Sequence, residues 1–201
     1  MIKNFLIINC TGRNDTIALK TNNKFFLKKL QTNIIKYEAL TLVILDFIKE
    51  HNVEIEQNFS ILVNSGPGSF SGIRIALAIT KGIQLVKKLN IYSYNNFVLN
   101  AAPYLKKTKS LISIIKTNNF YYFSEQVGVK DYIFTPPKKL DLSFLKTNSL
   151  LIVIPEELKN DKITSDIGEK KICIAEFDLK NVDILIQNNL LENKLIKPLY
   201  L

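Results

Sequence analysis

The sequence contains no tryptophan and a single histidine, His51. One histidine excludes the metal sites that need several, such as the H-E-x-x-H zinc motif. A lone histidine at the end of a predicted helix is far more often a polar surface residue than a metal ligand. No G-x-S-x-G nucleophile elbow is present either. The common metal and serine-nucleophile motifs are therefore missing.

Cysteine is also scarce. Cys10 and Cys173 lie far apart and form no C-x-x-C pair, so the usual zinc and redox motifs are absent. Both lie in apolar, strand-like segments, which is typical of reduced, buried cysteines in a cytoplasmic protein. No apolar run approaches membrane-span length, and the N-terminus lacks the apolar core of a signal peptide. We therefore expect a cytoplasmic protein that does not enter a membrane.

The chain is basic, with a formal net charge of +9 over 201 residues. Its lysines are scattered singly and in pairs, without a run of five, and the arginines are Arg13 and Arg74 alone. This pattern favours a solvated lysine-rich surface, and attraction to tRNA is the alternative. At 47% hydrophobic residues the chain can build one domain or two small lobes.

Residues 60–89 are the most informative stretch. Residues 60–64 are apolar and β-branched, as in a buried strand, and residues 73–89 have helical spacing. Between them lies a loop with three glycines and one proline. Backbone N–H groups in such a loop, at a helix N-terminus, favour an anion, so one interpretation is a phosphate site.

The spacing of the loop glycines favours a second interpretation. Gly66, Gly68 and Gly72 give G-x-G-x-x-x-G, one residue longer than the dinucleotide fingerprint. No Gly-Lys pair of a Walker A loop is present. The alternative is a tight strand-to-helix turn without a ligand.

Two predicted helices, 34–50 and 73–89, are apolar on more than one side. In the first, one stripe is Tyr37, Leu40, Ile44, Phe47 and Ile48, and another is Ala39, Leu42, Val43 and Leu45. In the second, Ala78 and Gly82 permit close approach of another helix. Such helices are either wholly buried in the core or present an outer face to a second protein.

The segment GPGSFSGIRIALAITKGIQL resembles the signature of the TsaB (YeaZ) family, GPGSFTGIR followed by a helix of small residues and Lys-Gly. The matching positions are Gly66, Pro67, Gly68, Ser69, Phe70, Gly72, Ile73, Arg74, Lys81 and Gly82. Ser71 replaces the family threonine and keeps its hydroxyl. The closing Pro198-Leu199-Tyr200-Leu201 resembles the end of these proteins and is an independent match.

The resemblance implies an α/β, actin-like fold of two lobes, like that of sugar kinases and chaperone ATPases, with the second lobe reduced. It implies a non-catalytic subunit that binds and stabilises a TsaD-type catalytic paralogue, which adds threonylcarbamoyl to a tRNA adenosine. A TsaE-type ATPase is a further implied partner, and tRNA is reached indirectly, through the complex. No resident cofactor is implied, although a nucleotide at the subunit joint is an alternative.

The resemblance and the helix faces together predict the site residues. We expect a non-catalytic glycine loop of Gly66, Pro67, Gly68, Ser69, Phe70, Ser71 and Gly72, with Arg74. We expect a partner interface of Tyr37, Leu40, Val43, Ile44, Phe47, Ile75, Ala78, Ile79, Gly82 and Leu85. An exposed apolar face of this size also predicts a homodimer when the chain is alone.

The sequence departs from the family pattern at three places. Asn9, Cys10 and Thr11 stand where the family commonly has Asp-Thr-Ser, so the carboxylate that a hard cation prefers is missing. Residues 36–37 replace a common His-Ser, and residues 116–118 replace Asp-Ala-Arg. The missing aspartate weakens the case for Mg-nucleotide chemistry, and the missing histidine argues against any role that the family histidine carries.

For domain organisation we expect one lobe over residues 1–105 and a smaller, diverged lobe over 106–201. The first opens with a three-stranded meander and the second with a hairpin at 110–125. We expect a polar connection over 156–168 and a helix over 182–191. Two other hypotheses remain open. One is an actin-like ATPase, kinase or peptidase-like enzyme, with Glu125 as its best acid, and the other is a basic RNA-binding module.

Overall fold

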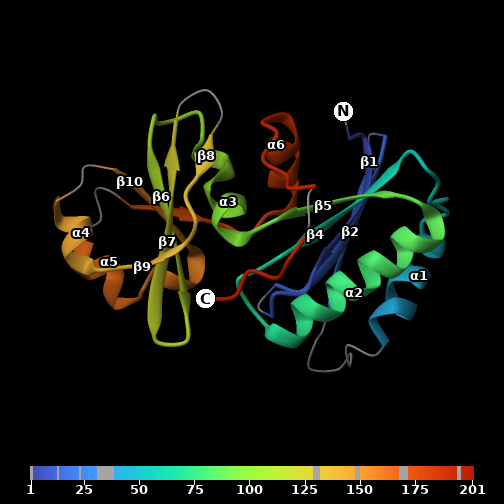
Figure 1. Cartoon of the computed structure of the whole chain (residues 1–201), viewed down its shortest axis with the longest axis horizontal. Coiled ribbons are helices and arrows are strands. Elements are labelled where there is room, and N and C mark those ends of the chain that lie inside the picture. Colours follow the sequence, from blue (N-terminus) through green and yellow to red (C-terminus); the bar gives the residue numbers. More distant parts are fainter. Residues whose placement is uncertain are drawn as a thin grey trace. The chain divides into compact units, whose positions relative to one another are not determined.

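The computed structural model describes residues 2–12, 14–22, 24–30, 39–128, 132–147, 150–167, 172–193 and 196–201. The chain forms two compact units, Met1–Asn95 with Leu191–Tyr200, and Asn96–Leu190 with Leu201 (Figure 1). The first unit therefore ends ten residues before the expected boundary at 105. The reason is that helix α3 (Asn96–Ala101) packs against strands of the second unit.

The first unit contains a five-stranded sheet with the order β3-β2-β1-β4-β5. Strands β1, β2 and β3 are antiparallel neighbours, which confirms the predicted meander, while β4 and β5 run parallel to β1 and to each other. The strands are β1 (Asn4–Asn9), β2 (Thr16–Thr21), β3 (Lys24–Lys29), β4 (Phe59–Asn64) and β5 (Asn90–Tyr94).

Two helices cover one face of this sheet, α1 (Leu40–Glu50) and α2 (Phe70–Lys87). The expected start of the first helix, with Tyr37, lies outside the described residues. Helix α2 begins three residues before the predicted start at 73. The Ser69 hydroxyl accepts a hydrogen bond from the Gly72 N–H at 3.2 Å and so caps the helix at that point.

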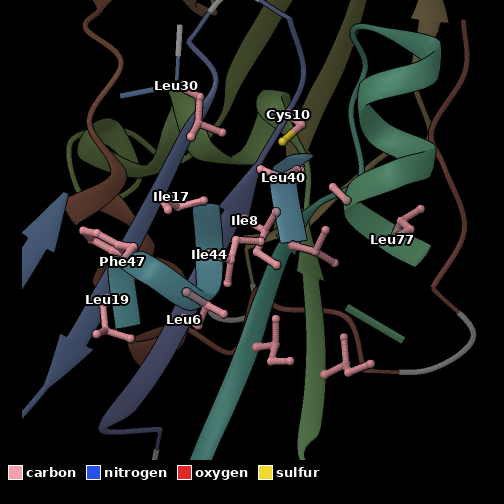
Figure 2. Close-up of a cluster of buried hydrophobic side chains, with 14 of the residues drawn as sticks. Leu6, Ile8, Cys10, Ile17, Leu19, Leu30, Leu40, Ile44, Phe47 and Leu77 are labelled. Atoms are coloured by element: carbon pink, nitrogen blue, oxygen red, sulfur yellow. The ribbon is translucent and has the colours of Figure 1, made fainter. Parts of the chain in front are cut away.

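The core of the first unit lies between the sheet and these helices (Figure 2). Alternate residues along each strand face it, such as Leu6 and Ile8 of β1, because successive side chains of a strand point to opposite faces. The helices contribute Leu40, Ile44 and Phe47 from α1 and Ile73, Ala76 and Leu77 from α2.

The second unit has a six-stranded sheet, ordered β11-β10-β6-β7-β8, with β9 also paired to β7. The antiparallel β6–β7 hairpin is the predicted opening of this half. The strands are β6 (Leu111–Thr117), β7 (Phe120–Val127), β8 (Ile133–Phe134), β9 (Lys138–Lys139), β10 (Leu151–Pro155) and β11 (Ile172–Ala175).

The helices of the second unit are short. Among the residues that the structure describes, four of them have six residues each, against 11 and 18 in the first unit. Besides α3 they are α4 (Leu142–Thr147), α5 (Lys162–Ile167) and α6 (Val182–Gln187). The 3₁₀ turns are η2 (Ala102–Tyr104), η3 (Glu156–Leu158) and η5 (Leu179–Asn181).

Two predictions for this half were wrong in detail. The expected polar connection at 156–168 contains η3 and α5, and α6 ends at Gln187 instead of residue 191. Asp161, just before α5, accepts hydrogen bonds from the Ile163 N–H at 3.3 Å and from Lys116 Nζ at 2.7 Å. The Tyr121 hydroxyl also donates to this carboxylate. The Ile163 contact lies at the start of a helix that the polar composition did not reveal.

Candidate functional site

The glycine loop after β4 packs directly on the turn after β1. A Cβ atom at Gly68 would overlap the carbonyl oxygen of Thr11 and would lie 2.7 Å from Thr11 Cβ. Gly66 has φ +112°, and a Cβ there would lie 2.8 Å from Ile73 Cδ1 and 2.9 Å from the Leu199 carbonyl oxygen. Glycine is therefore required at both positions. At Gly68 the reason is steric contact, and at Gly66 it is steric contact together with the positive φ.

The loop uses several of its backbone N–H groups internally. The Ser69 N–H donates to the Thr11 carbonyl at 2.7 Å, and the Gly66 N–H donates to Asn64 Oδ1 at 2.9 Å. The Gly72 N–H is held by the Ser69 cap described above. A phosphate cradle needs such donors for its ligand. The contacts therefore favour the tight-turn interpretation of the loop.

Asn9, which stands where the resembled family commonly has an aspartate, belongs to a hydrogen-bond network of neutral groups. The buried Asn9 accepts from Asn64 Nδ2 at 2.7 Å and from the Thr11 hydroxyl at 3.3 Å, both through Oδ1. Its Nδ2 donates to the Asn14 carbonyl at 2.6 Å. A carboxylate at Asn9 would place an acceptor against that carbonyl, so the surroundings fit an amide.

Cys10 follows Asn9 and lies in the core of the first unit. Burial raises the pKa of its thiol well above the usual range, and the nearby Asp15 carboxylate raises it further. The thiol is therefore protonated at neutral pH and is a poor nucleophile.

The α1 half of the predicted interface needs correction. Leu40, Ile44 and Phe47 point into the core (Figure 2), so they are closed to a partner. Val43 is half-buried and packs against the same core. The exposed apolar residues of α1 are Leu42 and Leu45, which belong to the other stripe that the sequence showed. Burial therefore removes Leu40, Ile44 and Phe47 from the predicted interface and leaves the second apolar stripe as the exposed one.

On α2 the predicted residues divide differently. Ala78, Gly82 and Leu85 are exposed, whereas Ile75 and Ile79 are half-buried against the core. Leu85 is 80% exposed, and its neighbour Val86, which the prediction missed, is 79% exposed. A Cβ at Gly82 would have nothing within 4 Å. We call the exposed stripe of Arg74, Ala78, Gly82, Leu85 and Val86 the α2 face.

The N-terminal end of the α2 face carries an aromatic–arginine cluster of Phe70, Arg74 and Tyr200. Arg74 Cζ lies 3.9 Å from the centre of the Phe70 ring, and its Nε donates to the Tyr200 hydroxyl at 3.1 Å. The two rings are 4.9 Å apart. Sequence reasoning included Phe70 and Arg74 but not Tyr200, although the C-terminal Pro-Leu-Tyr-Leu match was a signal for it.

The C-terminal segment brings Tyr200 to this place. The Leu199 N–H donates to the Ser65 carbonyl at 2.7 Å, and Glu192 and Ser93 exchange two backbone hydrogen bonds of 2.8 and 2.9 Å. Ile196 packs against the core of the first unit. The chain end is therefore fixed along the glycine loop.

Other candidate residues have structural surroundings. His51 stacks on Phe26 with ring centres 3.9 Å apart and meets the edge of Phe47 at 4.8 Å. Glu125 is half-buried on β7 opposite Ile112. Over the described residues, no cluster of three or more histidine, cysteine or carboxylate side chains is placed to hold a metal ion. No described helix is long and apolar enough to span a membrane.

Comparison with known proteins found one curated relative and several solved structures. A tRNA threonylcarbamoyladenosine biosynthesis protein TsaB from Buchnera aphidicola subsp. Baizongia pistaciae (strain Bp) is 28% identical over 129 residues. That alignment covers 60% of this chain and only 58% of the relative. No family model matches the chain.

The solved structures agree on the fold. YeaZ from Pseudomonas aeruginosa has a TM-score of 0.69 at 12% identity and covers 99% of this chain and 100% of its own. A second structure, of an uncharacterized protein with similarity to peptidase YEAZ from the same organism, also scores 0.69. AlfA from a B. subtilis plasmid, in a filament, scores 0.53 at 10% identity, over 92% and 98% of the two chains.

These neighbours confirm the predicted actin-like α/β fold. The sequence alignment adds a specific relationship to the fold, because it joins this chain to a TsaB protein. The glycine-loop signature, the aligned TsaB protein and the YeaZ structures together make the chain similar to the TsaB (YeaZ) family in sequence and in fold.

Proposed function

We propose that the chain is a non-catalytic subunit of the machinery that adds threonylcarbamoyl to a tRNA adenosine. Its partner is a TsaD-type catalytic paralogue, which it binds through the exposed faces of α1 and α2. The α2 face carries the proposal, because Leu85 and Val86 are more exposed than any other large hydrophobic side chain among the described residues. The name of the aligned relative, a threonylcarbamoyladenosine biosynthesis protein, supports the pathway.

The composition of this surface supports a helical partner. Helices α1 and α2 cover the same face of the sheet, and each leaves apolar residues in water on its far side. Ala78 and Gly82, four residues apart, let another helix come close, while Leu85 and Leu42 supply larger apolar groups. Burying each such leucine contributes about 1.5–3 kcal/mol to association before the entropic costs. Helices α1 and α2 would then form half of a helical bundle, and helices of the partner would form the other half.

The neutral network at Asn9 supports the non-catalytic role. Nucleotide-hydrolysing proteins of the resembled fold need an aspartate at the turn after the first strand. Here the amide of Asn9 is held by three hydrogen bonds that suit a neutral group. The chain would then act by stabilising and ordering the catalytic paralogue.

Without its partner, the chain is proposed to form a homodimer through the same face. An exposed apolar surface tends to be covered in solution, and two-fold dimers are the commonest outcome. Such a dimer would compete with formation of the complex. The free energy needed to dissociate it would therefore lower the apparent affinity of the chain for its partner.

Co-purification with the TsaD-type paralogue from the same genome tests the proposal. The wild-type chain should form a stable complex, and Ala78→Glu should abolish it, because a long, charged side chain would be buried at a close helix contact. Ala78 is exposed, so this variant should fold normally. Gln57→Glu, which adds the same charge in an exposed loop, is the matched control. Two folded proteins that never co-elute would contradict the proposal.

A further inference from the structure

The aromatic–arginine cluster holds a positive charge in a fixed orientation without neutralising it. Arg74 is stacked on Phe70 and hydrogen-bonded to the Tyr200 hydroxyl, and neither group is acidic. Among the residues that the structure describes, no carboxylate forms an ion pair with Arg74. All three side chains are exposed. A fixed, exposed and unpaired guanidinium at a surface is suited to bind an anion.

The contacts of Arg74 also determine which of its donors remain. The Nε–H is used by Tyr200, and the ring of Phe70 covers one face of the guanidinium. The two Nη groups donate to no described residue. Paired N–H donors at the end of a planar guanidinium match the two oxygens of a carboxylate. Stacking holds the fork in one orientation, so less entropy is lost when a carboxylate binds.

The charge of α2 indicates a partner of opposite sign. From Phe70 to Lys87 the helix carries Arg74, Lys81 and Lys87 and no aspartate or glutamate, and Lys88 follows as its C-cap. Arg74 lies one turn before Ala78, so the cluster continues the apolar α2 face. In a two-fold contact of α2 with a second copy of itself, like charges would meet. Like charges would therefore weaken the proposed homodimer, and the surface fits an acidic partner better than another copy of this chain.

We propose that Phe70, Arg74 and Tyr200 form a receptor for an aspartate or glutamate side chain of the partner protein. Arg74 binds the carboxylate, and Phe70 and Tyr200 are positioning residues that hold the guanidinium. The inference rests on the proposed function, and it adds that the partner presents an apolar helix face flanked by carboxylates. Arginine and tyrosine are enriched among the residues that dominate interface affinity.

The test measures the Kd of the complex with the TsaD-type paralogue by calorimetry at 50 and 500 mM NaCl. Arg74→Gln should weaken binding roughly tenfold to hundredfold at low salt, as expected for a lost charge-assisted hydrogen-bond pair. It should also reduce the salt dependence, and the lysines of α2 account for what remains. Arg74→Lys should restore little of the affinity, because lysine cannot form the stacked fork. Tyr200→Phe should weaken binding a few-fold.

Lys106→Gln, which removes an exposed positive charge in the second unit, is the matched control and should leave Kd unchanged. Circular dichroism should show all variants folded, since the altered side chains are exposed. The inference is overturned if Arg74→Gln binds within twofold of wild type while Ala78→Glu abolishes binding, and the proposed function then stands. It is also overturned if Arg74→Gln changes only self-association. Absence of binding by the wild-type chain would contradict both.

Discussion

Two glycine-to-alanine substitutions in the same unit should have opposite effects on stability. At Gly68 the new Cβ would overlap the Thr11 carbonyl oxygen and lie 2.9 Å from its carbon, and these backbone atoms cannot move without shifting the β1–β2 turn. Overpacking of this kind costs about 1–3 kcal/mol. Loss of the hydrogen bond from Ser69 N–H to Thr11 would add about 0.5–1.5 kcal/mol.

The free energy of unfolding of Gly68→Ala should therefore fall by about 2–4 kcal/mol, which lowers Tm by roughly 5–15 °C in a chain of this size. Gly82→Ala should instead raise stability by about 0.8–1 kcal/mol, because the new methyl meets open space in a helix interior. Thermal unfolding followed by circular dichroism measures both. A Gly68→Ala variant that melts with the wild type would refute the close docking of the glycine loop on Thr11.

Three further predictions follow from burial and charge. In urea titrations, Ile44→Ala should lower the free energy of unfolding by about 2–5 kcal/mol, because Ile44 is buried. Leu42→Ala should change it by less than about 0.5 kcal/mol, because Leu42 is exposed. Equal effects of the two variants would contradict the assignment of the buried and exposed faces of α1. Burial disfavours the Asp161 carboxylate, but the hydrogen bonds that it accepts hold its pKa below the usual range. Because the pKa of Asp161 is lower in the folded state, its carboxylate stabilises the fold above the pKa of about 3.9 that an aspartate has in the unfolded chain. This stabilisation is lost as the pH falls through the pKa of the folded state. Acid should therefore destabilise the wild type more steeply than Asp161→Asn. In thiol labelling followed by mass spectrometry, the half-buried Cys173 should react faster than the buried, protonated Cys10, and equal rates would contradict the core position of Cys10.

Much of the first unit could be predicted from the sequence because its signals are local. Alternation and Asn-rich turns indicated the meander, and a β-branched run followed by glycines indicated β4 and the loop. The start of α2 was placed too late because Ser69, not the end of the glycines, caps the helix. The second unit was harder to predict. Asp161 accepts from the Ile163 N–H at the start of α5, and its carboxylate is also held by residues 40 and 45 positions away, which no local pattern shows.

The site was partly predictable for the same physical reason. The sequence showed that α1 is apolar on two sides, but only the packing of Leu40, Ile44 and Phe47 against the sheet determines which side is left exposed. On α2 the small residues Ala78 and Gly82, which the sequence singled out, lie on the exposed side of the helix. The C-terminal match marked Tyr200 in the sequence, but its contact with Arg74 joins residues 126 positions apart and is seen only in the folded chain.

The partner-subunit proposal is tested most directly by size-exclusion chromatography with light scattering of this chain mixed with the TsaD-type paralogue of the same genome. A 1:1 complex that forms with the wild type and with Gln57→Glu, but not with Ala78→Glu, is the predicted result. Separate elution of the two folded wild-type proteins, or a complex unchanged by Ala78→Glu, would contradict the proposed function or its interface.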